Sequence, residues 1–269
     1  MIRVAIIGAA GRMGRALLRV ASEFPELTIV AALTSPASTD LGLDAGELAS
    51  GRASGVPLTS DLPAALALAD VAIDFSSPQA TQTNLAACGR AHRALLIGTT
   101  GFSADLTPAI EATSREIPLL VAPNTSLGVT LLVELVRAAA RALPAGFDIE
   151  ILEAHHRTKR DAPSGTALAL GRAAAEGRGQ VFEQVASTGR AAGSARREGE
   201  IGFAVLRGGD IVGEHTVLFA GSGERLSLSH QATDRAIFAR GALQAASWLT
   251  AKPAGRYFMR DLVTYKSAG

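Results

Sequence analysis

The chain has 269 residues, with 26 Lys and Arg, 25 Asp and Glu, and 48% hydrophobic residues. This length suits one large domain or two modest ones with an ample core, and the net charge of +1 gives no reason to expect nucleic acid or an anionic membrane as a partner. The single cysteine, Cys88, excludes an internal disulfide and a cysteine-based metal cluster.

The first predicted element is a strand at residues 3–7, followed by a glycine-rich turn and a helix. The turn reads Gly8-Ala9-Ala10-Gly11-Arg12-Met13-Gly14, and the order strand, glycine turn, helix is that of the dinucleotide-binding fingerprint. The glycines allow a pyrophosphate to approach the backbone at the helix N-terminus. We therefore expect a dinucleotide cofactor, with an ordinary glycine-rich turn as the alternative. Arg12 is either a phosphate contact or a plain surface charge.

Strands and helices alternate through the first half of the chain. We expect further strands at residues 27–33, 71–75, 94–98 and 119–122 and helices at 61–69, 78–91 and 103–115. This alternation predicts an α/β fold with a doubly wound, parallel, Rossmann-type sheet. Loops at the carboxyl ends of the strands should then contact the cofactor, or else be ordinary turns that need glycine. The candidate loops are residues 74–78, 98–101 and 122–125.

Two apolar stretches do not have the character of membrane or export segments. Residues 127–143 contain Glu134, Arg137 and Arg141, too many charges for a membrane span. Residues 1–20 carry Arg and Gly where a signal sequence needs an apolar core. We expect a soluble, cytoplasmic protein.

The pattern changes after residue 145 and predicts a second domain. Strands are expected at residues 147–154, 201–207, 211–220 and 225–231. Glycine turns at 208–210 and 221–223 predict hairpins, hence an antiparallel or mixed sheet in an α+β domain. Such a sheet has one face to cover and few helices to cover it, so we expect subunit association.

The domain boundaries follow from this change. We expect a dinucleotide-binding domain of residues 1–126 plus 236–269, because residues 235–249 form an amphipathic helix that should pack back on the first domain. Residues 127–235 form the substrate-binding and oligomerisation domain. Within it, residues 177–200 lack periodicity and predict a solvated loop, with a mobile lid as the alternative.

The most informative stretch is residues 153–167, Glu-Ala-His-His-Arg-Thr-Lys-Arg-Asp-Ala-Pro-Ser-Gly-Thr-Ala. Four groups that donate or relay protons lie within five residues: His155, His156, Arg157 and Lys159. Pro163 and Ser164 then predict the start of a helix at 165–176, and the amides at such a start bind carboxylate or phosphate. A cationic cluster facing an anion pocket fits a small acidic substrate that must also be protonated.

The histidines need separate interpretations. Adjacent residues on a strand end point to opposite sides, so we expect at most one of His155 and His156 to be catalytic. No third ligand of suitable spacing accompanies the pair, so we expect no metal site. His215 and His230 lie in strand patterns and are expected to be hydrogen-bonded sheet residues.

The 153–167 segment and the 8–14 fingerprint are accompanied by three further motifs: Gly98-Thr-Thr-Gly-Phe102, Ile201-Gly-Phe and Arg207-Gly-Gly-Asp-Ile-Val-Gly-Glu-His215. Together these motifs resemble the 4-hydroxy-tetrahydrodipicolinate reductase family, also called dihydrodipicolinate reductase. The resemblance runs nearly end to end. It implies NAD(P)H-dependent reduction of a small cyclic imine dicarboxylate in the diaminopimelate and lysine pathway, by a homotetramer that associates through the second domain's sheet.

The resemblance also implies roles for single residues. His155 matches the family's acid/base histidine, His156 a substrate contact, and Lys159 the proton-donating lysine, while Gly165 and Thr166 match the pair that holds a substrate carboxylate. The implied cofactor contacts are Gly8, Ala9, Ala10, Gly11, Arg12, Met13, Gly98, Thr99, Thr100, Ala122, Pro123, Asn124 and Thr125.

The chain departs from the family pattern at the end of the second strand. The family often has an acidic residue that serves NADH followed by a basic residue that serves NADPH, whereas this chain has Thr34 and Ser35. No carboxylate is present to repel a 2′-phosphate, and Arg12 is nearby. We expect use of both NADPH and NADH, with a tilt toward NADPH. Thr125 also replaces the aromatic residue or Met often found beside the nicotinamide.

Two alternatives remain open. Another two-domain NAD(P)-dependent dehydrogenase of an amino-acid precursor, such as aspartate or homoserine dehydrogenase, would act on a saturated substrate but leaves the His155-His156-x-x-Lys159 motif unexplained. A catalytically idle nucleotide sensor would bind cofactor without turnover, and an intact catalytic motif speaks against it.

Overall fold

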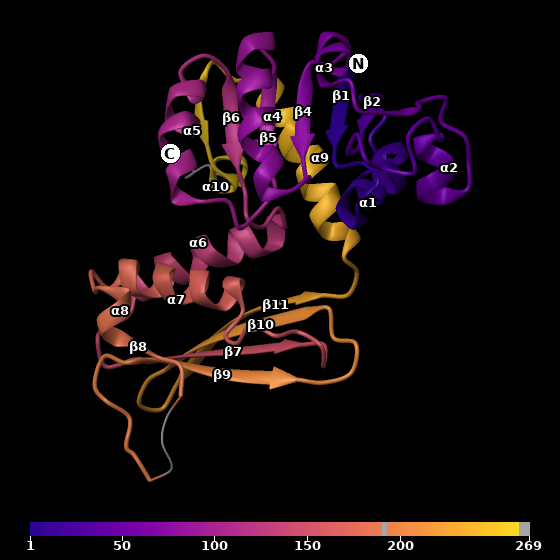
Figure 1. Cartoon of the computed structure of the whole chain (residues 1–269). Coiled ribbons are helices and arrows are strands. Elements are labelled where there is room, and N and C mark those ends of the chain that lie inside the picture. Colours follow the sequence, from indigo (N-terminus) through magenta and orange to yellow (C-terminus); the bar gives the residue numbers. More distant parts are fainter. Residues whose placement is uncertain (190–192, 264–269) are drawn as a thin grey trace. The chain divides into compact units, whose positions relative to one another are not determined.

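The computed structural model describes residues 1–189 and 193–263. They form two compact units (Figure 1): unit 1 is Met1–Ser126 together with the segment from Ala236 onward, and unit 2 is Leu127–Arg235. The chain therefore leaves unit 1, builds unit 2 and returns to unit 1.

Unit 1 is built on a seven-stranded sheet in which every pairing is parallel. The strand order is β12-β6-β5-β4-β1-β2-β3. The strands are β1 Ile2–Ile7, β2 Leu27–Leu33, β3 Leu58–Thr59, β4 Val71–Asp74, β5 Ala94–Ile97, β6 Pro118–Val121 and β12 Gly255–Tyr257. The predicted doubly wound, Rossmann-type sheet is confirmed.

Helices cover both faces of this sheet. They are α1 Arg12–Val20, α2 Ala45–Ser50, α3 Leu62–Leu68, α4 Pro78–Ala91, α5 Thr107–Ser114, α9 Ala236–Thr250 and α10 Met259–Leu262, with 3-10 turns at Ala21–Glu23 and Ala104–Leu106. Side chains of α3, α4 and α5 share one core with β1, β2, β5 and β6. On the other side, α9 contacts α1, β4, β5 and β6. The strands are apolar on both faces because both faces are buried.

The return of the chain to unit 1 confirms one prediction and adds elements that were not predicted. The helix expected at 235–249 is α9, and it packs on the first sheet. After it, β12 adds a strand beside β6. Like α2 and β3, β12 is too short for hydrophobic periodicity to be visible in the sequence.

Unit 2 is a five-stranded mixed sheet with helices on one face (Figure 1). Its elements are α6 Leu127–Ala142, β7 Asp148–His155, α7 Gly165–Gly177, α8 Phe182–Val185, β8 Ala186–Ser187, β9 Ile201–Arg207, β10 Gly213–Ala220 and β11 Arg225–Ala232. Apolar side chains of α6 and α7 form one core with the inner residues of β7, β9 and β10, for example Ile151, Phe203 and Phe219.

The predicted hairpin at residues 208–210 is wrong. The sheet order is β11-β10-β7-β9-β8, so β7 separates β9 from β10. β9 pairs with β7 in parallel, and β10 pairs with β7 antiparallel. The glycines bind the end of β7 instead: Gly208 N donates to His155 O (3.0 Å), and Arg157 N donates to Gly209 O (3.2 Å). The hairpin at 221–223, between β10 and β11, is confirmed.

The segment 177–200 is less irregular than predicted. It contains α8 and β8, and β8 pairs in parallel with β9. Residues 190–192 of this segment lie outside the described residues, and the lid alternative stays a prediction. Among the helices of the described ranges, none is long and apolar enough to cross a membrane.

Candidate active site

The central strand of unit 2 ends in the predicted catalytic segment. Glu153 and His155 are two residues apart on β7, so both point to the helix-covered side of the sheet, and both are buried. His156 follows the strand and is only half-buried, with its Nδ1 2.8 Å from Thr158 Oγ1. The two adjacent histidines therefore have different surroundings.

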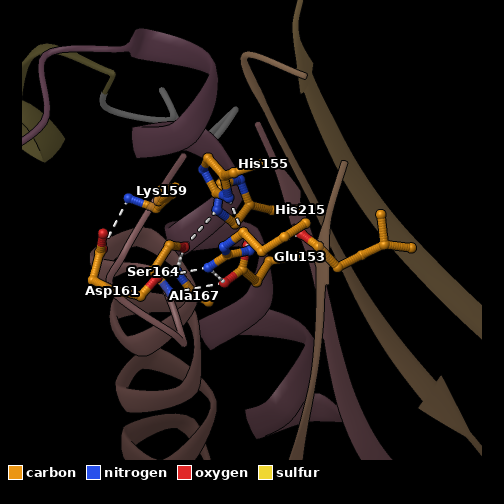
Figure 2. A network of polar contacts seen from close by, with 9 residues as sticks. Glu153, His155, Lys159, Asp161, Ser164, Ala167 and His215 are labelled. Atoms are coloured by element: carbon orange, nitrogen blue, oxygen red, sulfur yellow. Dashed lines mark hydrogen bonds and ion pairs between the residues drawn. The ribbon is translucent and has the colours of Figure 1, made fainter. Parts of the chain in front are cut away.

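Glu153 is the centre of a polar network (Figure 2). Arg207 donates from Nη1 to Oε2 at 2.7 Å and from Nη2 to Oε1 at 2.8 Å. His155 Nδ1 lies 2.6 Å from Oε2, and Ser164 N donates to Oε1 at 2.9 Å. Burial by itself would raise the pKa of Glu153, but the hydrogen bonds from Arg207, His155 and Ser164 outweigh it and hold this pKa below its usual value.

The surroundings of His155 have opposing effects on its pKa. Burial lowers the pKa of His155, and so do the positive charges of Lys159 and Arg207, whereas the Glu153 carboxylate raises it. The net effect is a pKa below the usual value. A histidine whose pKa lies below its usual value is mostly neutral at neutral pH.

His215 also contacts the residues of this site, and the sequence did not predict this contact. It lies in β10 as expected, but its ring meets the ring of His155 edge-on, with centroids 5.1 Å apart, and its Nε2 lies 3.0 Å from Ser164 Oγ. Burial lowers the pKa of His215 to about 4. The missed signal was its position at the end of the Arg207–His215 motif, since Arg207 and His215 lie on the two strands that flank β7.

Lys159 lies in the turn that follows β7. Its Nζ forms an ion pair with Asp161 Oδ2 at 2.8 Å (Figure 2), and its backbone N donates to His156 O at 3.1 Å. The hydrogen bond and charge of Lys159 lower the pKa of Asp161. The ammonium group is half-buried and near enough to His155 to affect its titration.

The helix start predicted at Ser164 is confirmed. Ser164 is the N-cap of α7, and its Oγ accepts a hydrogen bond from Ala167 N at 3.2 Å. Gly165 is exposed and Thr166 half-exposed at the first positions of the helix. The first amides of a helix have no acceptor within it, and the helix dipole is positive there. This end of α7 is therefore suited to a carboxylate.

In unit 1 the glycine-rich turn follows β1 and leads into α1. Gly8 has φ +85°, and a Cβ on it would lie 2.5 Å from Phe75 O, while a Cβ on Gly14 would overlap Gly8 O. No side chain caps α1, which begins after Gly11. Such a tight backbone with an uncapped helix start fits a dinucleotide's phosphates. Ala9 is buried, Ala10 and Met13 are half-buried, and Arg12 is exposed.

The other predicted cofactor loops lie at the same edge of the parallel sheet. Gly98 N and Thr99 N both donate to Asp74 O, and Thr100 is exposed. A Cβ on Gly98 would overlap the ring of Phe75. The buried Asp74 carboxylate also accepts hydrogen bonds from Ser76, Asn84 and Thr99, a support for this loop that the sequence did not indicate.

The loop after β6 and the end of β2 complete this edge. Ala122 N donates to Ile97 O, Pro123 is exposed, and Asn124 Oδ1 accepts from Ser126 N. Thr125 is buried, and its Oγ1 donates to Phe238 O at 2.7 Å, so its hydroxyl binds α9. At the end of β2, Thr34 N donates to Thr59 O, and the exposed Ser35 accepts from Ala37 N.

The described part of the chain offers no metal site. Within residues 1–189 and 193–263, no group of three His, Cys, Asp or Glu side chains is arranged to hold a metal ion. Unit 2 holds a cluster of proton-transfer groups next to a helix start suited to an anion. Unit 1, described by itself, holds a glycine-rich turn suited to phosphate.

Comparison with known proteins identifies similar chains. Models described as dihydrodipicolinate reductase, N-terminus, and dihydrodipicolinate reductase, C-terminus, match residues 2–125 and 128–263. Proteins named 4-hydroxy-tetrahydrodipicolinate reductase from Alkalilimnicola ehrlichii and Halorhodospira halophila are 50% and 48% identical to this chain, each over 97% of it and 98% of their own length.

A solved structure is also similar. A dipicolinate-bound dihydrodipicolinate reductase from Paenisporosarcina sp. TG-14 has a TM-score of 0.78 and 27% identity, with 96% of this chain and 97% of that one covered. An amine dehydrogenase from Mycobacterium smegmatis, at 14% identity and a TM-score of 0.59, shares the fold.

Proposed function

This chain belongs to the dihydrodipicolinate reductase family, and on that premise we propose that it is the NAD(P)H-dependent 4-hydroxy-tetrahydrodipicolinate reductase of diaminopimelate and lysine biosynthesis. The observation that carries the proposal is the site in unit 2. His155 is connected to the start of α7, because Ser164, the N-cap of this helix, donates to the Glu153 carboxylate that also contacts His155. Lys159 lies in the segment between β7 and α7 and is paired with Asp161. The alternative, a dehydrogenase that acts on a saturated amino-acid precursor, leaves the His155-His156-x-x-Lys159 motif unexplained.

Each part of the site has a task in this reaction. NAD(P)H, when bound, supplies the hydride that reduces the unsaturated ring of the substrate. Negative charge then develops toward the ring nitrogen, where a nearby cation and proton source stabilise the transition state. Lys159 is the cation, and His155 exchanges the proton. The amides of Gly165 and Thr166 hold a carboxylate of the substrate, and His156 is a further substrate contact.

The unit 1 turn supports the cofactor assignment. The residues that would hold the pyrophosphate are Gly8–Met13, because the backbone there is close-packed and the start of α1 has no side-chain cap. For cofactor choice we propose use of both forms with a preference for NADPH. Thr34 and Ser35 bring no carboxylate to the end of β2, and Arg12 is an exposed cation at the start of α1.

The open face of the unit 2 sheet supports the proposal of a homotetramer. Leu152 and Leu206, on the face away from α6 and α7, are 45% and 57% exposed. Leu152 lies opposite Ala204 on one side, and Ala154 lies opposite Leu206, so the apolar side chains are contiguous. A contiguous exposed apolar patch of this kind marks an association surface.

The test is a coupled steady-state assay. The preceding synthase would generate the substrate from pyruvate and aspartate semialdehyde, and oxidation of NADH and NADPH would be followed at 340 nm. We expect turnover with both cofactors and a higher kcat/KM with NADPH. A ratio that strongly favours NADH would contradict the interpretation of Thr34 and Ser35. Binding of both cofactors without turnover would contradict the reductase and favour a nucleotide sensor.

A further inference from the structure

Resting on the proposed function, we propose that Glu153 is a positioning residue that fixes His155 for proton transfer and joins it to the anion-binding start of α7. Its side chain has no exposed surface. A buried carboxylate is costly unless it is paired and hydrogen-bonded, and this one has four donors. Only two of them come from the counter-ion Arg207.

The first of the other two donors is His155. An ionised carboxylate only accepts hydrogen bonds, so the 2.6 Å contact with Glu153 Oε2 places a proton on His155 Nδ1. The neutral imidazole then has Nε2 as its free basic atom. Nε2 points toward β10 at Gly213, where a Cβ would lie only 3.0 Å from it. The carboxylate therefore selects both the tautomer and the orientation of the ring.

The second is the amide of Ser164. Glu153 Oε1 accepts this hydrogen bond at 2.9 Å. Ser164 in turn caps α7 through Ala167 N, and its hydroxyl meets His215 Nε2. One carboxylate thus holds both the proton-transfer group and the helix start that binds a substrate carboxylate. A residue needed only for folding would not have to join these two parts.

The charges around His155 decide how its titration responds. Glu153 on β7, Arg207 at the end of β9, His215 on β10 and Lys159 in the turn after β7 all face it. Glu153 is the anion of this set, and its charge raises the pKa of His155. Loss of that charge lowers the pKa of His155, so the protonated form persists only to a lower pH.

The experiment compares three variants of the full-length enzyme over a pH series. Glu153→Gln keeps the shape of the side chain and removes its charge. We expect kcat to fall about 10- to 100-fold, a smaller fall than removal of the acid/base group itself would cause. The upper pH limit of kcat/KM should move to lower pH. Glu153→Asp keeps the charge. Its upper pH limit should therefore match that of the wild type, and its kcat should lie between those of the wild type and Glu153→Gln. The control is Glu183→Gln on α8, which removes another carboxylate paired with an arginine, Arg172, and should leave both kcat and the pH limit unchanged.

The outcomes separate positioning from simple structural support. The proposal is overturned if Glu153→Gln keeps the wild-type pH limit, or if Gln and Asp lose activity equally without any change in pH profile. A measurement on the wild-type enzyme covers the case of a variant that does not fold. ¹⁵N NMR of its five histidines, assigned with His155→Gln, should find the neutral His155 ring protonated at Nδ1. Protonation at Nε2 would overturn the proposal.

Failure of the proposed reductase function would give a different result from failure of the Glu153 proposal. In that case wild-type enzyme would not oxidise NAD(P)H in the coupled assay, whatever the variants do. The His155 tautomer would still report on the Glu153 contact, because it is measured without turnover.

Discussion

Lys159 and Asp161 form an ion pair with very unequal members, since the lysine is half-buried and the aspartate is exposed. We expect Lys159→Met to lower kcat by about 10²–10⁴, the usual loss when a positioned acid/base group is removed. Asp161→Asn should cost less than about fivefold, because an exposed pair contributes only about 0–1 kcal/mol. Steady-state kinetics on both variants would check this. Equal losses would mean that the pair, and not the lysine, is what the reaction needs.

Burial of His215 makes stability depend on pH. Its pKa in the folded chain is about 4, against an ordinary 6.5. Below pH 6.5 the unfolded chain therefore binds a proton that the folded chain does not, and stability falls as the pH drops toward 4. At pH 5 this costs about 2 kcal/mol of unfolding free energy. Urea unfolding at pH 7 and pH 5 should find a smaller pH effect in His215→Gln than in wild type. An equal effect in both would exclude His215 as its source.

The turn after β1 depends on one glycine. In Gly8→Ala, the new Cβ would meet Phe75 O at 2.5 Å with a strained positive φ. We expect a loss of NADPH affinity of at least 10-fold, measured by calorimetric titration. Gly42→Ala is the matched control, since Gly42 has φ +82° with no atom within 4 Å of the added methyl. Equal effects on affinity would show that backbone strain alone, rather than the close approach, is responsible.

Helix starts are the elements that the sequence predicted best. Asp61 and Ser77 cap α3 and α4 with their side chains, and the predicted helices at 61–69 and 78–91 lie within one residue of the observed ones. The cap is also a source of stability. Asp61→Ala should cost about 1 kcal/mol and lower Tm by about 2–4 °C, as measured by calorimetry. No change in Tm would mean that α3 is held by its packing alone.

Strand pairing was less predictable. A glycine turn between two strands does not distinguish a hairpin from a crossover, and so Gly208-Gly209-Asp210 was misinterpreted. The site shows the same limit. The positions of His155 and Lys159 follow from a local motif, whereas Arg207 and His215 reach Glu153 and Ser164 only through the order of the strands. Long-range pairing is set by the packed core and has no local signature.

For the whole molecule, the open face of the unit 2 sheet should govern assembly. Leu152→Glu places a charge in the middle of this face, between Ala204 and Thr216. If the chain forms the proposed homotetramer through this face, the variant should have a smaller mass. Light scattering coupled to size exclusion would measure the mass. Leu68→Glu is the matched control, because Leu68 is an exposed leucine on α3. A Leu152→Glu protein of unchanged mass would mean that assembly uses another surface.

The discontinuity of unit 1 has a consequence for synthesis on the ribosome. Its first six strands emerge before unit 2, but α9, which packs on β4, β5 and β6, is made only after unit 2 is complete. Until α9 is made, the nascent chain therefore carries an apolar face of the first sheet that lacks this helix. Unit 2, in contrast, has all of its elements once Arg235 has been made. A chain stopped after Arg235 should yield a protease-resistant unit 2 and a digested remainder. We therefore expect the domain that begins synthesis to be the last to finish folding.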